Sequence, residues 1–193
     1  MSVIVAIKQN GVVYMGADTQ TTTSKTRMTG LNETAFKITK LENGMLIGFC
    51  GLVAAKQEIL SIKNLFILNE RGEIDKKHIV NNIVPKLADK LDAIGDEESG
   101  ALDVSILIAH KNKLYKITSK LDVISLNNVG ASGAGLGFSF YYLYAKTNLP
   151  IKQRILKSLA ESAKRTESVG GPYVLIDTKN LQYEIIDLGD ENH

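Results

Sequence analysis

The most constraining feature of this 193-residue sequence is its first strand-like run. Residues 2–8 (Ser-Val-Ile-Val-Ala-Ile-Lys) are almost all apolar, whereas a strand with one solvated face alternates apolar and polar residues. Asn10-Gly11 follows, and both residues tolerate the positive φ of a two-residue hairpin turn. Val12–Ala17 is the return strand and leads to Asp18. The pattern predicts a hairpin that is covered on both faces.

The rest of the chain alternates groups of strands with pairs of helices. Strand patterns lie at 35–41, 45–50, 103–110, 114–119, near 129, and at 174–177 and 183–187. Helical patterns lie at 52–69, 79–91 (with Asp75 as N-cap and Pro85 as a kink), 134–146 and 151–167. Two packed sheets with helices on both outer sides suit this order. We predict one α+β domain over residues 1–193, a four-layer αββα sandwich.

The composition is that of an ordinary globular protein. Apolar residues make up 44%, charged residues 23%, and the formal net charge is +2. No basic run is long or aromatic-laced enough to predict nucleic-acid binding. No apolar run approaches the roughly 20 residues that span a bilayer, and no signal peptide is visible. We expect a cytoplasmic protein that binds neither nucleic acid nor membrane.

Cysteine and histidine give no sign of a metal or thiol site. Cys50 is the single cysteine and lies in an apolar run, which favours a buried packing role. The three histidines, His78, His110 and His193, show no ligand-like or catalytic spacing. We therefore expect no metal and no cofactor.

Five short segments resemble the proteasome β-subunit and HslV family, in the family's order. They resemble its opening hairpin, its Ala-Asp-Thr-Arg or Gly-Asp-Gly-Gln signature, the start of its first helix, its Gly-Ser-Gly turn, and its last Gly-Gly pair. The segments are Ile4–Val13, Gly16–Gln20, Phe49–Ala55, Val129–Gly133 and Gly170-Gly171. Together they extend the resemblance from residue 2 to about 187, and they imply the same αββα fold.

The resemblance implies an N-terminal nucleophile. In this family the side chain of the first mature residue attacks, and its own α-amino group, with a pKa near 8, serves as the base. Ser2 falls on that position once Met1 is removed, although many proteins begin Met-Ser. Asp18 falls on the acidic partner, Gly51 on the oxyanion-hole glycine, and Ser132 on the serine beside the amine. Taken singly, these three residues also suit a strand cap, close helix–strand packing and a turn.

The sequence departs from the family at the lysine that lowers the nucleophile's proton affinity. An ungapped count from Asp18 puts this lysine at Thr34, while Lys25 and Lys37 are out of register. The Asp and Ser that precede the family's Gly-Gly pair correspond to Thr166 and Val169. Because valine cannot hydrogen-bond to an amine, the sequence predicts that most of the proton-handling network is missing.

Two features bear on substrate binding. The stretch 19–26 is polar and β-prone, and favours an exposed loop or edge strand. With Thr19, Thr21 and Thr22 it could bind an extended peptide by adding it to the sheet edge. Phe49 could line a specificity pocket, with ordinary core packing as the favoured alternative.

Three hypotheses remain open. The first is a threonine-peptidase-like hydrolase of peptide or amide bonds. The second is a non-catalytic scaffold that kept the fold, and the third is a peptide-binding module. Symmetric association is usual for such folds, so a homo-oligomer is expected. An ATP-dependent unfoldase partner is implied only by the resemblance.

Overall fold

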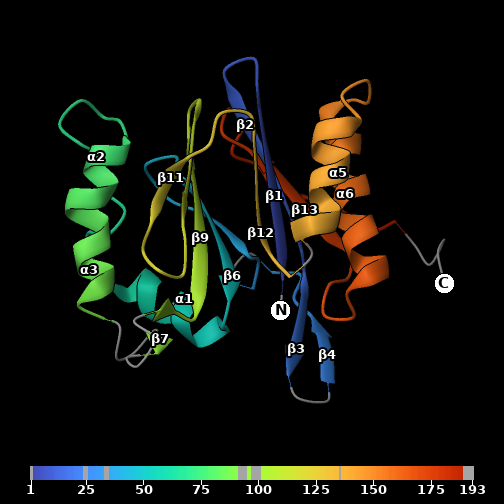
Figure 1. The fold of residues 1–193 in the computed structure, drawn as a ribbon, viewed down its shortest axis with the longest axis horizontal. Helices are drawn as coiled ribbons and strands as arrows, with labels where there is room; N and C mark the ends of the chain where they lie inside the picture. The colour runs from blue at the N-terminus through green and yellow to red at the C-terminus, as the bar shows by residue number, and fades with distance from the viewer. Residues whose placement is uncertain are drawn as a thin grey trace.

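The computed structural model describes residues 2–23, 26–32, 35–90, 95–96, 101–134 and 136–188. Two five-stranded antiparallel sheets pack face to face, and helices cover the outer side of each (Figure 1). The predicted αββα sandwich is confirmed. Each predicted strand has an observed counterpart in the same order, although the one predicted at 35–41 covers only Ile38–Lys40. The strand at Val123–Ser125 was not predicted.

The first sheet carries the predicted hairpin near its centre. Its strand order is β12-β1-β2-β13-β14. Asn10 and Gly11 form the turn with φ of 51° and 79°. The strands are β1 (Val3–Gln9), β2 (Val12–Asp18), β12 (Val129–Gly133), β13 (Tyr173–Asp177) and β14 (Glu184–Ile186).

The second sheet has the order β11-β10-β9-β6-β5. Its strands are β5 (Ile38–Lys40), β6 (Leu46–Gly51), β9 (Val104–His110), β10 (Lys113–Ile117) and β11 (Val123–Ser125). Two small hairpins lie outside the sandwich: β3 (Gln20–Thr23) with β4 (Thr26–Thr29), and β7 (Gly95–Asp96) with β8 (Ala101–Leu102). The β3–β4 hairpin projects from the end of the molecule where the N-terminus lies (Figure 1).

The position of β1 explains why it is apolar throughout. Successive side chains of a strand point to opposite faces. Ile4 and Ala6 therefore pack between the sheets, while Val3, Val5 and Ile7 pack against the helices. All five are at most 2% exposed.

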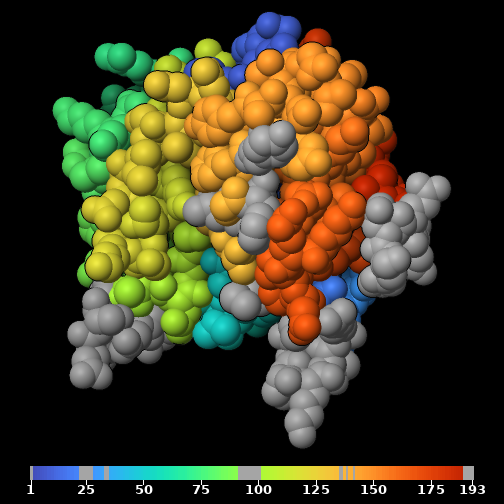
Figure 2. Space-filling view, turned by 45° about the vertical axis from the view of Figure 1, so that its right-hand side comes forward, coloured from blue at the N-terminus to red at the C-terminus, as the bar shows by residue number. Residues whose placement is uncertain are grey.

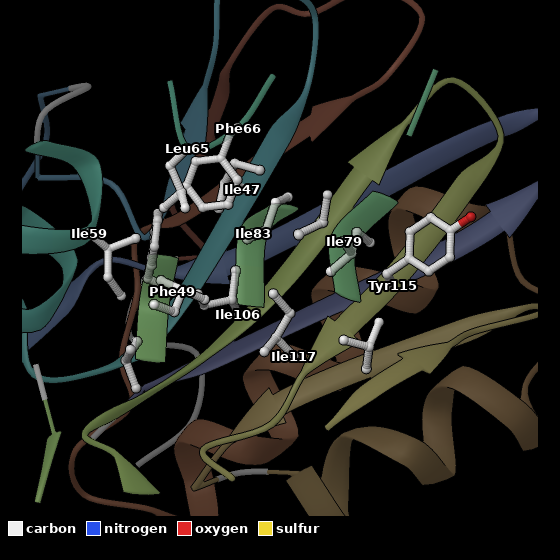
Figure 3. Close-up of a cluster of buried hydrophobic side chains, with 14 of the residues drawn as sticks. Ile47, Phe49, Ile59, Leu65, Phe66, Ile79, Ile83, Ile106, Tyr115 and Ile117 are labelled. Carbon is white, nitrogen blue, oxygen red and sulfur yellow. The ribbon is translucent and has the colours of Figure 1, made fainter. Parts of the chain in front are cut away.

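Helices form the two outer layers. The long pair α5 (Leu136–Ala145) and α6 (Ile151–Arg165) covers the first sheet and dominates one face of the molecule (Figure 2). On the other side lie α1, α2, η1 and α3, and residues of α1, η1 and α3 form an apolar cluster with the second sheet (Figure 3). Their bounds are Val53–Ser61, Lys76–His78, Ile79–Ile83 and Val84–Ala88.

The prediction of one buried helix over 52–69 is wrong. Helix α1 ends at Ser61, and Asn64 adopts a φ of 55°, which does not continue a helix. Leu52 and Val53 are more than half exposed. The apolar residues that follow the helix, such as Phe66, pack into the core from an irregular segment. The continuous apolar pattern therefore covers a helix and a buried irregular segment.

The segment around Pro85 keeps its helical course. The Asp75 side chain caps it by accepting from His78 N at 2.7 Å, as predicted. Val84 N donates to Ile79 O, five residues back, so η1 is a π-helical turn. A wider turn directly before a proline eases the clash that its ring makes with the preceding turn.

Candidate active site

The backbone of Ser2 is fixed between β1 and β12. Ser2 is 7% exposed, and its carbonyl accepts a hydrogen bond from Ala134 N at 2.9 Å. Val3 pairs with Gly133, whose φ is 105°. A Cβ at Gly133 would lie 1.9 Å from the Ser2 carbonyl oxygen, so only glycine allows this approach.

Asp18 is tied to the residue after Ser2. It ends β2, is fully buried, and accepts from Val3 N through Oδ1 at 2.9 Å. A second backbone hydrogen bond comes from Gly170. These donors fix the carboxylate beside the start of β1.

Lys37, which the sequence prediction set aside as out of register, forms an ion pair with Asp18. Its Nζ lies 2.6 Å from Asp18 Oδ2 and 2.6 Å from the carbonyl oxygen of Gln20. The ungapped count from Asp18 to Thr34 stops three residues short of Lys37, and Lys37 is the residue that pairs with Asp18. Thr34 and Lys25 lie outside the described residues. Counting back from the strand that starts at Ile38 would have been the better guide.

Opposing effects act on the Asp18 carboxyl. Burial raises its pKa, whereas the Lys37 ammonium and the two backbone N–H donors act in the other direction. Lys37 is itself only 8% exposed, so each charge of the ion pair has little contact with water and is compensated mainly by the other. The Asp18 carboxylate therefore links the Lys37 ammonium to the backbone at the start of β1.

Gly51 ends β6 in a conformation that favours glycine. Its φ is 147°, and a Cβ there would lie 2.0 Å from Asp103 O. The neighbouring Leu52 N donates to Asp103 O at 3.0 Å, and α1 follows at Val53. Close packing on β9 thus accounts for the glycine, and it sets the backbone path between β6 and α1.

Cys50 is a packing residue, as expected. It is 5% exposed, and its Sγ donates to Ser132 O at 3.2 Å. Burial raises the pKa of Cys50 to about 12. A thiol with that pKa is not ionised at neutral pH and cannot act as the nucleophile.

Ser132 has a partner that the sequence did not suggest. Ser132 is 1% exposed, and its hydroxyl is hydrogen-bonded to the hydroxyl of Ser105 on β9. Ser105 is the single hydroxyl-bearing residue in an otherwise apolar strand up to His110. That isolated polar residue was the available signal.

Comparison with known proteins identifies the family. The family model described as Proteasome subunit matches residues 2–165. The chain belongs to the proteasome subunit family.

Solved structures of similar fold cover nearly the whole chain. Thiobacillus denitrificans BPH superposes with a TM-score of 0.69 at 15% identity, covering 91% of this chain and 96% of that one. HslV from Trypanosoma brucei gives 0.66 at 16% identity, covering 91% and 98%. Anbu (ancestral beta-subunit) from Yersinia bercovieri gives 0.72 at 13% identity, covering 97% and 87%. These similarities extend the shared fold past residue 165.

The three threonines predicted to contact substrate differ from one another in their surroundings in this proteasome-family chain. Thr19 is 2% exposed, and its hydroxyl donates to Pro172 O at 2.7 Å, which ties β2 to the segment before β13. Thr21 is half-buried on β3 and pairs with Met28. The backbone of Thr22 pairs with Arg27 on β4, while its side chain lies outside the described part.

Phe49 is a core residue. It is 4% exposed, and its ring meets that of Phe66 edge-on at 6.5 Å (Figure 3). Its side chain points to the α1 side of the second sheet, within the apolar cluster. The structure supports the packing alternative over the specificity-pocket one.

The segment before Gly170-Gly171 holds the two residues, Thr166 and Val169, that the resemblance pairs with an Asp and a Ser. Val169 is 3% exposed and packs in the cluster formed with α5, α6 and Val3. Thr166 is half-buried and caps the end of α6. Among the described contacts, neither residue forms a hydrogen bond with Ser132.

Within the described residues, no cluster of three or more His, Cys, Asp and Glu could hold a metal ion. The described helices likewise include none that is long and apolar enough to cross a membrane.

Proposed function

We propose that this proteasome-family chain is an N-terminal-nucleophile peptidase or amidohydrolase, with Ser2 as nucleophile after Met1 is removed. The observation that carries the proposal is the buried Lys37–Asp18 ion pair, which is hydrogen-bonded to Val3 N directly after Ser2. A buried charge pair is costly to maintain, which supports a functional role for this pair as the source of the cation that the reaction needs.

The proposed reaction uses groups of the chain alone. The α-amino group of Ser2 takes the proton of the Ser2 hydroxyl, and Oγ attacks the carbonyl carbon of the substrate. The Gly51 N–H donates to the oxygen of the tetrahedral intermediate. Its collapse gives an ester on Ser2, and the amine returns the proton to the leaving nitrogen. Water then hydrolyses the ester by the same proton transfers.

Lys37 and Asp18 have separate roles in this scheme. The Lys37 charge favours the ionised form of the Ser2 hydroxyl as it attacks. Asp18 holds the Lys37 ammonium in place and prevents an isolated buried cation. An extended peptide lying along β3, near Thr21, is the proposed substrate geometry. We also propose a cytoplasmic homo-oligomer, with an ATP-dependent unfoldase as its partner.

A non-catalytic scaffold is the second candidate, because Val169 removes one hydroxyl of the family's site. The two candidates differ in what happens to Met1. If Met1 stays, the amine lies one residue away from the Ser2 hydroxyl and cannot act as its base.

The test starts with the intact mass of the purified full chain. We expect loss of one methionine, followed by a covalent adduct with epoxomicin, a compound found in complex with Thiobacillus denitrificans BPH. Peptide mapping should place the adduct on Ser2. Ser2→Ala should abolish it, and Ser61→Ala, which alters an exposed serine, should leave it unchanged. Complete retention of Met1, or no adduct on Ser2, would favour the scaffold.

A further inference from the structure

Three side chains of the second sheet hold the same short piece of β12. Cys50 Sγ donates to Ser132 O at 3.2 Å, and Lys116 Nζ donates to Ala131 O at 3.1 Å. The Ser105 hydroxyl bonds to the Ser132 hydroxyl. They come from three neighbouring strands, β6, β10 and β9. Because β12 is an edge strand, these bonds fix residues that its own sheet pairs on one side only.

The fixed residues lie beside Ser2. Ile4 pairs with Ser132, Val3 pairs with Gly133, and Ala134 donates to the Ser2 carbonyl. The Ser132 side chain points into the space between the sheets, since it meets Ser105 there. The Ser132 hydroxyl, on the strand that pairs with the first residues of β1, is therefore held from the opposite sheet.

The Ser105–Ser132 bond determines what Ser132 can offer to an amine. A hydroxyl has one proton to donate and two lone pairs. If the Ser132 proton goes to Ser105, its lone pairs remain free to accept an N–H. If Ser105 were absent, the proton could turn to the lone pair of the amine, which the base needs.

We propose that Ser105 is a positioning residue for Ser2: its hydroxyl accepts the Ser132 proton, so that Ser132 faces the α-amino group of Ser2 as a hydrogen-bond acceptor. This inference rests on the proposed function. No proton is transferred between the two serines. Their role is to orient the amine lone pair toward the Ser2 hydroxyl and to stabilise the ammonium that forms.

The experiment uses the full chain with Ser2 as its first residue, released from a fusion whose protease cuts before Ser2. The variants are Ser105→Ala, Ser105→Thr and, as matched control, Ser139→Ala. Ser139 forms a second buried serine pair, with its hydroxyl 2.7 Å from that of Ser162, between α5 and α6. Both alanine variants lose one serine–serine bond, but only one of these bonds lies beside Ser2.

Two quantities are measured. The first is the pKa of the Ser2 amine, from the pH dependence of its acylation by acetic anhydride. The second is kcat/KM against pH for a peptide substrate. We expect Ser105→Ala to lower the amine pKa by ~0.5 unit and kcat/KM about tenfold. Ser105→Thr should restore both values, and Ser139→Ala should change neither.

A Ser105→Ala variant that matches Ser139→Ala in both measurements would overturn the proposal. If Ser105→Ala does not fold, Ser105→Cys takes its place, since a thiol is a weak acceptor of similar size. The amine pKa decides the question even without turnover. A wild-type chain that forms no adduct at Ser2 refutes the proposed function, whereas an unshifted amine pKa in the Ser105 variants refutes this inference.

Discussion

The residues on the two sides of Ser2 differ in chemical character. On the β2 side, Asp18 and Lys37 form a buried ion pair hydrogen-bonded to the start of β1. On the C-terminal side, Val169, which the family resemblance pairs with a serine, packs against the helices and Val3. One side therefore carries a buried ion pair and the other a buried apolar side chain.

Physical chemistry accounts for this asymmetry. Removing one partner of a buried ion pair leaves an uncompensated charge, at a cost of about 3–5 kcal/mol. Losing one hydrogen-bonded hydroxyl costs about 1 kcal/mol, and an apolar replacement recovers some of this by packing. A single substitution should therefore cost more stability at the ion pair than on the Val169 side.

The strongest test of the comparison is Lys37→Met. We expect the free energy of unfolding to fall by about 3–5 kcal/mol, because Asp18 is left buried and unpaired. Urea unfolding measures the loss. Lys152→Met is the matched control, since its ion pair with Glu184 is half exposed and should contribute less than about 1 kcal/mol.

The double variant Lys37→Met with Asp18→Asn should recover part of that stability, because no buried charge remains. If the single Lys37 and Lys152 variants lose equal stability, the two sides of Ser2 do not differ in the way proposed.

Gly133→Ala tests the contact that joins β12 to Ser2. A Cβ at Gly133 would lie 1.9 Å from the Ser2 carbonyl at a φ of 105°, so we expect a loss of about 3 kcal/mol. Gly137→Ala is the control, since nothing lies within 4 Å of its added Cβ and it lies in α5. It should be neutral or stabilising in thermal unfolding. Equal stability of the two variants would contradict the close approach.

Val169→Ser tests the other side of Ser2. The change creates a small cavity and buries a hydroxyl among the apolar residues that pack against α5 and α6. We therefore expect the free energy of unfolding, measured by chemical denaturation, to fall by about 2 kcal/mol. We expect no gain in kcat/KM, because the side chain at this position packs with α5 and α6. An increase in kcat/KM would mean that the side chain reaches the Ser2 site.

The smallest effect concerns Cys50 at high pH. Its pKa is raised to about 12 from an ordinary 9.0, so the folded chain holds this proton more tightly than the unfolded chain. The stabilisation is fully present below pH 9 and is lost as pH rises toward 12. Between pH 8 and 10 we expect the free energy of unfolding to fall by about 1.4 kcal/mol through this group.

Cys50→Ala removes that contribution, so its unfolding free energy should depend less on pH over the same range. Tyr173, whose pKa burial also raises to about 12, continues to titrate in both proteins and adds a shared background. An identical pH dependence in wild type and Cys50→Ala would show that Cys50 is not protected as described.

The sequence was sufficient for the fold and for part of the site. Strand periodicity, the Asn10-Gly11 turn and the two C-terminal helices are local signals, and each was predicted correctly. Helix α1 was predicted too long, because its apolar continuation packs as an irregular segment. Local pattern cannot distinguish these two kinds of burial.

The sequence did not predict the partners of Asp18 and Ser132, and the reason is different. Lys37 was misplaced because loop length between strands is not fixed by physics, so counting residues across a loop loses register. Ser105 was missed because its partner Ser132 lies 27 residues away on the other sheet. Such contacts depend on the packing of two sheets, which no short window of sequence contains.

The two backbone hydrogen bonds around Ser2 have a consequence for conformational entropy. A residue at a chain terminus normally samples many backbone states, and a reaction that needs one of them is slowed accordingly. Here the Ser2 carbonyl is held by Ala134 and the next amide by Asp18, so most of that freedom is removed when the chain folds. A nucleophile and base carried on this residue would meet each substrate already oriented.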